Sequence, residues 1–225
     1  MPELLKKILS YLFAFILVFS SVLSVPVKAE SKLETRAVKH ALSILYSTET
    51  GHNNLFQRNY ANYLVTKKGG MEIGAASWYG NNAKELIAYI KNSKSTSKSD
   101  KAVCKKILAN WNSVKSGKKY KKEVIRIINS ATGRNLQNAF TKMKIRQYFK
   151  TAQKLGVKKL SGKIMSANIL HQSGEKALKR ILKKAKKPYT CNSIYKALQS
   201  DSGNQVGTYK ARQNFVKNIL SILPY

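Results

Sequence analysis

Acidic residues are scarce in this sequence: 10 Asp and Glu stand against 42 Lys and Arg in 225 residues, a formal net charge of +32. Any chemistry that needs a carboxylate therefore draws on a short set of side chains. Apolar residues are not scarce, since 43% of the chain is hydrophobic. A wholly disordered polycation is excluded, and the length fits one compact domain.

Cysteine and histidine are also few. Cys104 and Cys191 show neither metal-ligand spacing nor a pairing pattern, so a disulfide and two free thiols both stay open. His40, His52 and His171 lie far apart in the sequence, without a cysteine or carboxylate at ligand spacing. We expect no metal site and no organic cofactor.

The N-terminus has the pattern of an export signal. Lys6 and Lys7 precede an uncharged apolar run at 8–25, and Val-Lys-Ala at 27–29 has the form of a signal-peptidase site. This predicts a signal peptide at 1–29 and a secreted, extracellular or wall-associated domain at 30–225. The alternative is an uncleaved membrane anchor, because the run approaches spanning length.

The positive charge requires an anionic partner. Nucleic acid is the usual inference for a chain this basic, but predicted export argues against it. Export favours anionic wall polymers such as teichoic acids, anionic lipid headgroups or acidic glycans. The lysines are scattered along the whole chain, which indicates a generally cationic surface. We expect a monomer that binds no nucleic acid.

Apolar periodicity predicts an α+β fold that is predominantly α-helical. A helix is expected at 36–50, and a loop with a small hairpin at 52–80. The polar stretch 92–101 reads as a mobile surface insert. The rest is expected to be helical, with separate helices at 164–171 and 177–185 among others.

Glu49 continues the apolar stripe of its predicted helix, four residues after Leu45 and seven after Leu42. A glutamate on the core side is partly desolvated, and desolvation favours the protonated form that a general acid needs. The alternative is a frayed helix end that faces water.

Trp78 and Tyr79 lie at the end of the predicted hairpin. A glutamate at a helix end, then a hairpin with aromatic residues, then many helices is the layout of lysozyme-like glycosidases, in which aromatic faces stack on sugar rings. Both aromatic residues are equally consistent with a place in the core.

Five segments of the sequence resemble a family of lysozyme-like cell-wall hydrolases from Gram-positive bacteria and their phages, of the endolysin and tail-lysin type. The segments are 46–51 (YSTETG), 73–80 (IGAASWYG), 167–174 (ANILHQSG), 187–190 (KPYT) and 199–213 (QSDSGNQVGTYKARQ). The resemblance implies a lysozyme-like fold with a small β-hairpin lobe and a helical lobe. It also implies peptidoglycan glycan strands as substrate and the helix-ending glutamate as the acid.

The chain departs from that family at two places. Ala76-Ser77 stands where relatives tend to have Gly-Gln, and Ser173 stands where they tend to have glycine. Loss of an amide beside the substrate removes a hydrogen bond, so altered or reduced activity is an expected consequence.

A second carboxylate is needed by retaining and inverting hydrolases, whereas lytic transglycosylases use one acid and the N-acetyl group of the substrate. Glu72 alternates with apolar neighbours on the hairpin and is one candidate. Asp201 lies in the longest family-like segment and is the other, although it also suits an N-terminal helix cap. Glu85, three residues after Asn82, is assigned to a capping box at a helix start.

Asn168 and His171 lie three residues apart on an otherwise apolar helix face, so they must bond to an internal network or to a ligand. Arg212 is interpreted in the same way. The candidate substrate-binding residues are Trp78, Tyr79, Ser77, Asn168, His171, Gln172, Asn204, Gln205, Tyr209 and Arg212.

The leading hypothesis is a secreted hydrolase that cleaves glycosidic bonds of peptidoglycan, with Glu49 as general acid and Asp201 or Glu72 assisting. The rival is a non-catalytic cationic protein that binds the wall or membrane and keeps the lysozyme-like fold. A third reading, an extracellular nuclease or nucleic-acid binder, rests on charge alone. Muramidase, glucosaminidase and transglycosylase activity are not distinguished by the sequence.

Overall fold

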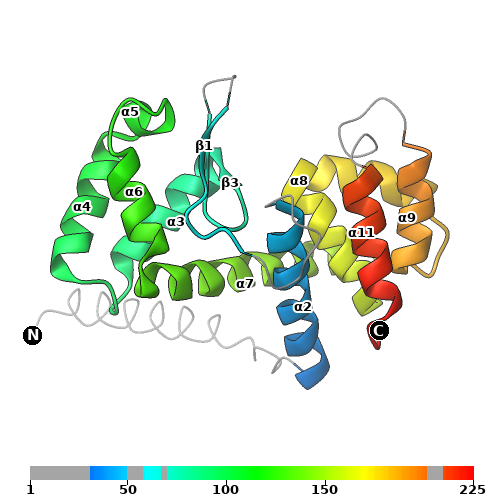
Figure 1. The fold of residues 1–225 in the computed structure, drawn as a ribbon. Helices are drawn as coiled ribbons and strands as arrows, with labels where there is room; N and C mark the ends of the chain where they lie inside the picture. The colour runs from blue at the N-terminus through cyan, green and yellow to red at the C-terminus, as the bar shows by residue number, and fades with distance from the viewer. Residues whose placement is uncertain (1–30, 50–57, 67–69, 202–209) are drawn as a thin grey trace, which may run out of the picture. The chain divides into compact units, whose positions relative to one another are not determined.

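The computed structural model of the chain describes residues 31–49, 58–66, 70–201 and 210–225 (Figure 1). These residues are mostly helical, with a small three-stranded antiparallel sheet. The predicted fold class, α+β with helices in excess, is confirmed. The predicted signal peptide lies outside the described residues. Within the described ranges, no helix combines the length and the apolar character needed to cross a bilayer.

The elements follow one another in the order helix, sheet, helices. They are α2 (Lys32–Glu49), β1 (Tyr63–Val65), β2 (Met71–Ile73), β3 (Trp78–Tyr79), α3 (Gly80–Asn92), α4 (Lys98–Ala109), α5 (Trp111–Lys115), α6 (Lys121–Asn129), α7 (Ala131–Lys154), α8 (Leu160–Lys184), α9 (Cys191–Gln199) and α11 (Lys210–Ser221). Helix α7 packs against α3 and α6, and also against α8, which in turn packs against α9 and α11 (Figure 1).

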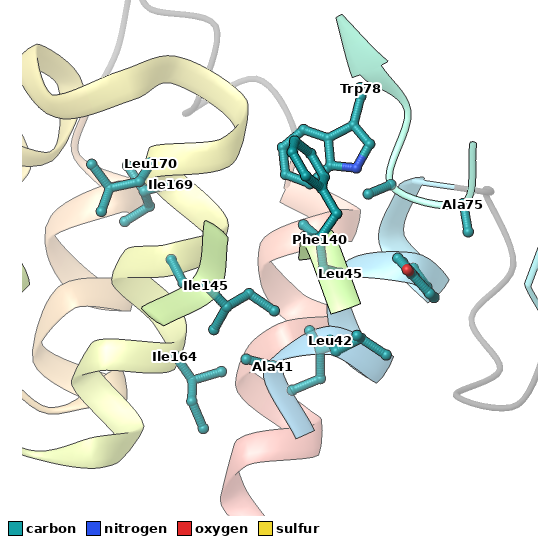
Figure 2. Packing of buried hydrophobic residues seen from close by; sticks show 14 of the residues in the cluster. Ala41, Leu42, Leu45, Ala75, Trp78, Phe140, Ile145, Ile164, Ile169 and Leu170 are labelled. Carbon is teal, nitrogen blue, oxygen red and sulfur yellow. The ribbon is translucent and has the colours of Figure 1, made fainter. Parts of the chain in front are cut away.

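Helix α2 confirms the predicted amphipathic helix and ends at Glu49. Its buried face includes Val38, Leu42 and Leu45, at the spacing that places side chains on one side of a helix. Figure 2 shows Leu42 and Leu45 in the core with Ile145 of α7 and Ile164 of α8. Burial of this face fixes the end of α2, and so Glu49, beside the rest of the fold.

The sheet has one face in the core and one face toward solvent. Glu72 of β2 lies opposite Leu64 of β1 and Tyr79 of β3, and Ile73 lies opposite Trp78. Side chains alternate along a strand, so Ile73 and Trp78 share the buried face. Leu64, Glu72 and Tyr79 share the other face, where Leu64 and Tyr79 are exposed.

The turn between β2 and β3 is fixed by one buried side chain of α7. Gln137 Oε1 accepts a hydrogen bond from the Ala75 amide at 2.9 Å, and Nε2 donates to the carbonyls of Tyr60 and Ile128 at 3.0 and 2.8 Å. Gly74 has a φ of 74°, and a Cβ there would lie 2.3 Å from Gln137 Oε1. Glycine therefore suits both the conformation and the close approach.

The prediction of a mobile loop over 92–101 is wrong, because α4 already begins at Lys98. After α3 ends at Asn92, a short turn leads to Ser97, which caps α4 by accepting a hydrogen bond from the Asp100 amide at 3.1 Å. The Asp100 carboxylate accepts a hydrogen bond from Arg126 at 2.7 Å. The serine-rich composition therefore includes a helix N-cap, a position that serine favours.

Two further expectations are corrected by the structure. The predicted capping box is wrong, because α3 begins at Gly80, while Asn82 and Glu85 both accept hydrogen bonds from Lys144 of α7, at 2.9 and 2.5 Å. The two helices expected at 164–171 and 177–185 are joined in α8, which is kinked at Gly174 (φ 75°, ψ −174°).

Both cysteines are free and buried, Cys104 in α4 and Cys191 in α9. Burial raises the pKa of Cys104 to about 11 and that of Cys191 to about 12. Both thiols are therefore protonated near neutral pH and act as small apolar groups of the core.

Candidate active site

The Glu49 carboxyl group lies at the last residue of α2 with 15% of its side chain exposed. Arg212 Nη1 of α11 donates a hydrogen bond to Oε1 at 2.5 Å, and His171 Nε2 of α8 lies 3.4 Å from the same oxygen. Both of these contacts are made with the same carboxylate oxygen, Oε1. The predicted partial burial of Glu49 is confirmed, and the ion pair with Arg212 was not expected.

A chain of hydrogen bonds holds Arg212 in place. Its Nε donates to Asn168 Oδ1 at 2.9 Å, and Asn168 Nδ2 donates to Gln213 Oε1 at 3.1 Å. Gln213 Nε2 then donates to Gln172 Oε1 at 3.3 Å. The polar groups of α8 thus bond to α11 in an internal network, which is one of the two readings that the sequence left open.

His171 links the sheet turn to Glu49. Its Nε2 lies 2.9 Å from the carbonyl oxygen of Ala76, and because a carbonyl can only accept, Nε2 carries the hydrogen. Burial lowers the pKa of His171, and the negative charge of Glu49 only partly opposes this. His171 is therefore neutral near neutral pH, and its contact with Glu49 is not an ion pair.

Glu72 on β2 is the second carboxyl group of the candidate site, and its pKa depends on the charge of Glu49. Burial raises the pKa of Glu72, and the negative charge of Glu49 raises it further. Its cross-strand neighbour on the same face is Tyr79, whose side chain is 50% exposed. The Tyr79 ring covers Gly70, where a Cβ would lie 2.2 Å from it. The outer face of the sheet thus offers a carboxyl group beside an accessible ring.

Tyr148 of α7 belongs to the same neighbourhood and was missed in the sequence. Its ring centroid lies 6.3 Å from that of His171. Burial raises the pKa of Tyr148, and the negative charges of Glu49 and Glu85 raise it further. Tyr148 lies three residues after the buried Ile145, which is the spacing of an ordinary core residue. No local sequence pattern therefore marks Tyr148 as a residue of the site.

The prediction that Trp78 binds substrate is wrong. The indole is 1% exposed and packs edge-on against Phe140 (Figure 2), with ring centroids 5.3 Å apart. It also packs edge-on against His171, with ring centroids 4.7 Å apart. A ring without accessible faces cannot stack on a sugar, so the core alternative is confirmed. Ser77 next to it has a φ of 46° and accepts a hydrogen bond from Asn62 at 3.0 Å.

Asp201 is placed in a different ionic cluster. It is 2% exposed, and Arg180 donates to both carboxylate oxygens at 3.2 Å, while Lys184 Nζ lies 3.5 Å away. Burial alone would raise the pKa of Asp201, but Arg180 and Lys184 outweigh it and lower the pKa. Its ion pairs with α8 indicate a structural role. The predicted site residues Asn204, Gln205 and Tyr209 lie outside the described residues.

Among residues 31–49, 58–66, 70–201 and 210–225, no three His, Cys, Asp or Glu side chains are grouped so that they could hold a metal ion. The groups that the described site offers for chemistry are the carboxyl groups of Glu49 and Glu72, with Arg212 and neutral His171 beside Glu49. Comparison with protein-family models, with curated proteins and with solved structures finds no match to this chain.

Proposed function

We propose that the protein is a secreted cell-wall hydrolase of lysozyme-like fold that cleaves glycosidic bonds of peptidoglycan, with Glu49 as the general acid and Glu72 as the second carboxylate. The observation that carries the proposal is the placement of a largely buried carboxyl group at the end of α2, with its charge acting on a second carboxyl group on the sheet. Glycosidic cleavage uses such a pair.

The proposed mechanism assigns one task to each group. Glu49 gives its proton to the glycosidic oxygen as the bond from that oxygen to the anomeric carbon breaks, and the leaving sugar departs as an alcohol. The Glu72 carboxylate stabilises the positive charge that develops on the sugar ring, or takes a proton from the attacking water. The exposed Tyr79 ring supplies a flat surface on which a sugar can stack.

The ion pair with Arg212 sets a condition for this mechanism. Arg212 donates a hydrogen bond to Oε1 of Glu49, so the proton that Glu49 gives to the glycosidic oxygen must be carried on Oε2. Glu72 has the raised pKa, so it readily accepts a proton in the free protein.

The proposal is tested first with the wild-type protein on purified Gram-positive cell walls, in a turbidity assay over a series of salt concentrations. We expect clearing that is fastest at low salt, because the cationic protein is then held on the anionic wall. Failure to clear at every salt concentration, in a preparation that sediments with the walls, would reject the enzyme.

Two variants separate the candidates for the second carboxylate. Glu72→Gln is expected to lower turnover by about 10²-fold or more, with wall binding unchanged. Asp201→Asn is expected to keep turnover near the wild-type value and to lower stability by about 1–2 kcal/mol, because charged hydrogen bonds to partly exposed partners are lost. Initial rates and denaturant unfolding measure the two effects.

The pH dependence of stability provides the control for Asp201. Its pKa is lowered in the folded protein, so its contribution is present at neutral pH and is lost as pH falls through the folded-state pKa. The stability difference between wild type and Asp201→Asn should therefore shrink in acid. Loss of turnover in Asp201→Asn with unchanged stability would contradict the assignment.

The second candidate function is a non-catalytic cationic protein that binds the wall or membrane. Two observations favour it: the ion pair that occupies Oε1 of Glu49, and the burial of Trp78, which leaves one aromatic surface fewer for a glycan. Binding to walls without release of soluble fragments is the result that this candidate predicts.

A further inference from the structure

A cavity of about 450 Å³ lies where the end of α8 meets the start of α9. Four of the residues around it are lysines. Its lining residues are Lys184, Lys186, Lys187, Pro188, Thr190, Asn192, Ser193, Lys196, Ala197 and Ser200. None of them belongs to the set around Glu49, so the cavity is a feature separate from the proposed active site.

Three of the four lysines bring positive charge that the described residues do not neutralise. Lys184 lies 3.5 Å from the Asp201 carboxylate. Lys186, Lys187 and Lys196 are exposed, and no ion pair with a carboxylate of the described ranges involves them. Like charges around one cavity repel each other, and a bound anion removes that repulsion.

The other lining groups indicate what kind of anion fits. Thr190, Asn192, Ser193 and Ser200 contribute polar surface, and Pro188 and Ala197 contribute apolar surface, which makes up the larger part of the lining. The described lining includes no aromatic ring. Binding of single-stranded nucleic acid relies on aromatic side chains on which bases stack. A polymer of phosphates and small polyols needs only cations and polar groups.

We propose that this cavity binds a phosphodiester-linked polyol polymer of the cell wall, and that it holds the protein there independently of the Glu49 site. Recognition of phosphate rests on the cavity and its lysines. The choice of a wall polymer rests on the proposed function, which places the protein at the wall. The repeating charges of such a polymer allow several phosphates to contact the lysines along one chain.

The test measures binding of purified poly(glycerol phosphate) to the full chain at about 0.15 M salt. The variant K186Q/K187Q/K196Q is compared with K118Q/K119Q/K122Q, which removes the same charge at exposed lysines, two between α5 and α6 and one in the first turn of α6. We expect the cavity variant to weaken binding by about tenfold or more, with a flatter salt dependence. The control should weaken binding by less than about threefold. The variant K186R/K187R/K196R, which keeps the three positive charges, should bind the polymer like the wild-type protein.

Equal losses in the two triple variants would overturn the proposal, because the overall charge would then explain binding. Tighter binding of a single-stranded oligonucleotide of equal charge would also overturn it. Activity on peptidoglycan stripped of wall polymers should be the same for wild type and the cavity variant. Because polymer binding is measured without turnover, failure of this site and failure of the proposed hydrolase give different results.

Discussion

Glu49→Gln is expected to lower the rate of peptidoglycan cleavage by about 10²–10⁴-fold, the range that a general acid contributes. Glutamine keeps the shape of the side chain and can still accept a hydrogen bond from Arg212, but it has no proton to give to a glycosidic oxygen. Binding to the wall should change little, since one charge among 52 charged side chains is altered. Initial rates of soluble fragment release measure the effect.

Glu175→Gln is the matched control for this prediction. Glu175 is about half exposed and pairs with Lys179 four residues later on α8, at 2.6 Å. An exposed pair of this kind contributes little to stability, so the control should retain wild-type activity. Equal activity of Glu49→Gln and wild type would remove Glu49 from the mechanism.

Trp78→Ala is expected to lower the free energy of unfolding by about 3–5 kcal/mol, as for other large aromatic residues removed from a core. The indole is fully buried and contacts the rings of Phe140 and His171. Its loss leaves a cavity behind His171, which contacts Glu49. Chemical denaturation measures the loss of stability, and activity should fall with it.

Tyr79→Ala gives the comparison at the adjacent residue on the opposite face of the sheet. Its ring is half exposed, so stability should fall by much less than in Trp78→Ala. Turnover on peptidoglycan should fall instead, because the proposed stacking surface is lost. A stability loss in Tyr79→Ala as large as that in Trp78→Ala would show that both rings serve the core.

The partial burial of Glu49 follows from local sequence, because helical periodicity places it on the same stripe as Leu42 and Leu45. The cation that contacts it does not follow from any local pattern. Arg212 lies 163 residues further along the chain, and only the packing of α11 against α8 brings it to the end of α2. The predicted partial burial of Glu49 is therefore confirmed, while its charged neighbour was missed.

In the sheet, too, one feature follows from local sequence and another depends on tertiary packing. Alternation along β3 places Trp78 and Tyr79 on opposite faces, but which face is buried depends on Phe140 and His171, which come from α7 and α8. At 92–101, the polar, serine-rich composition predicted a loop, but serine is common both in loops and at helix N-caps. The cap at Ser97 and the ion pair of Asp100 with Arg126 decide for a helix start.

Mass spectrometry of the soluble products from purified, polymer-stripped peptidoglycan tests the central claim most directly, with wild type and Glu49→Gln assayed in parallel. The account predicts glycan fragments with new reducing or anhydro sugar ends from wild type, and almost none from the variant. Glycan fragments in equal amounts from both proteins, or products cut only in the peptide stems, would contradict it.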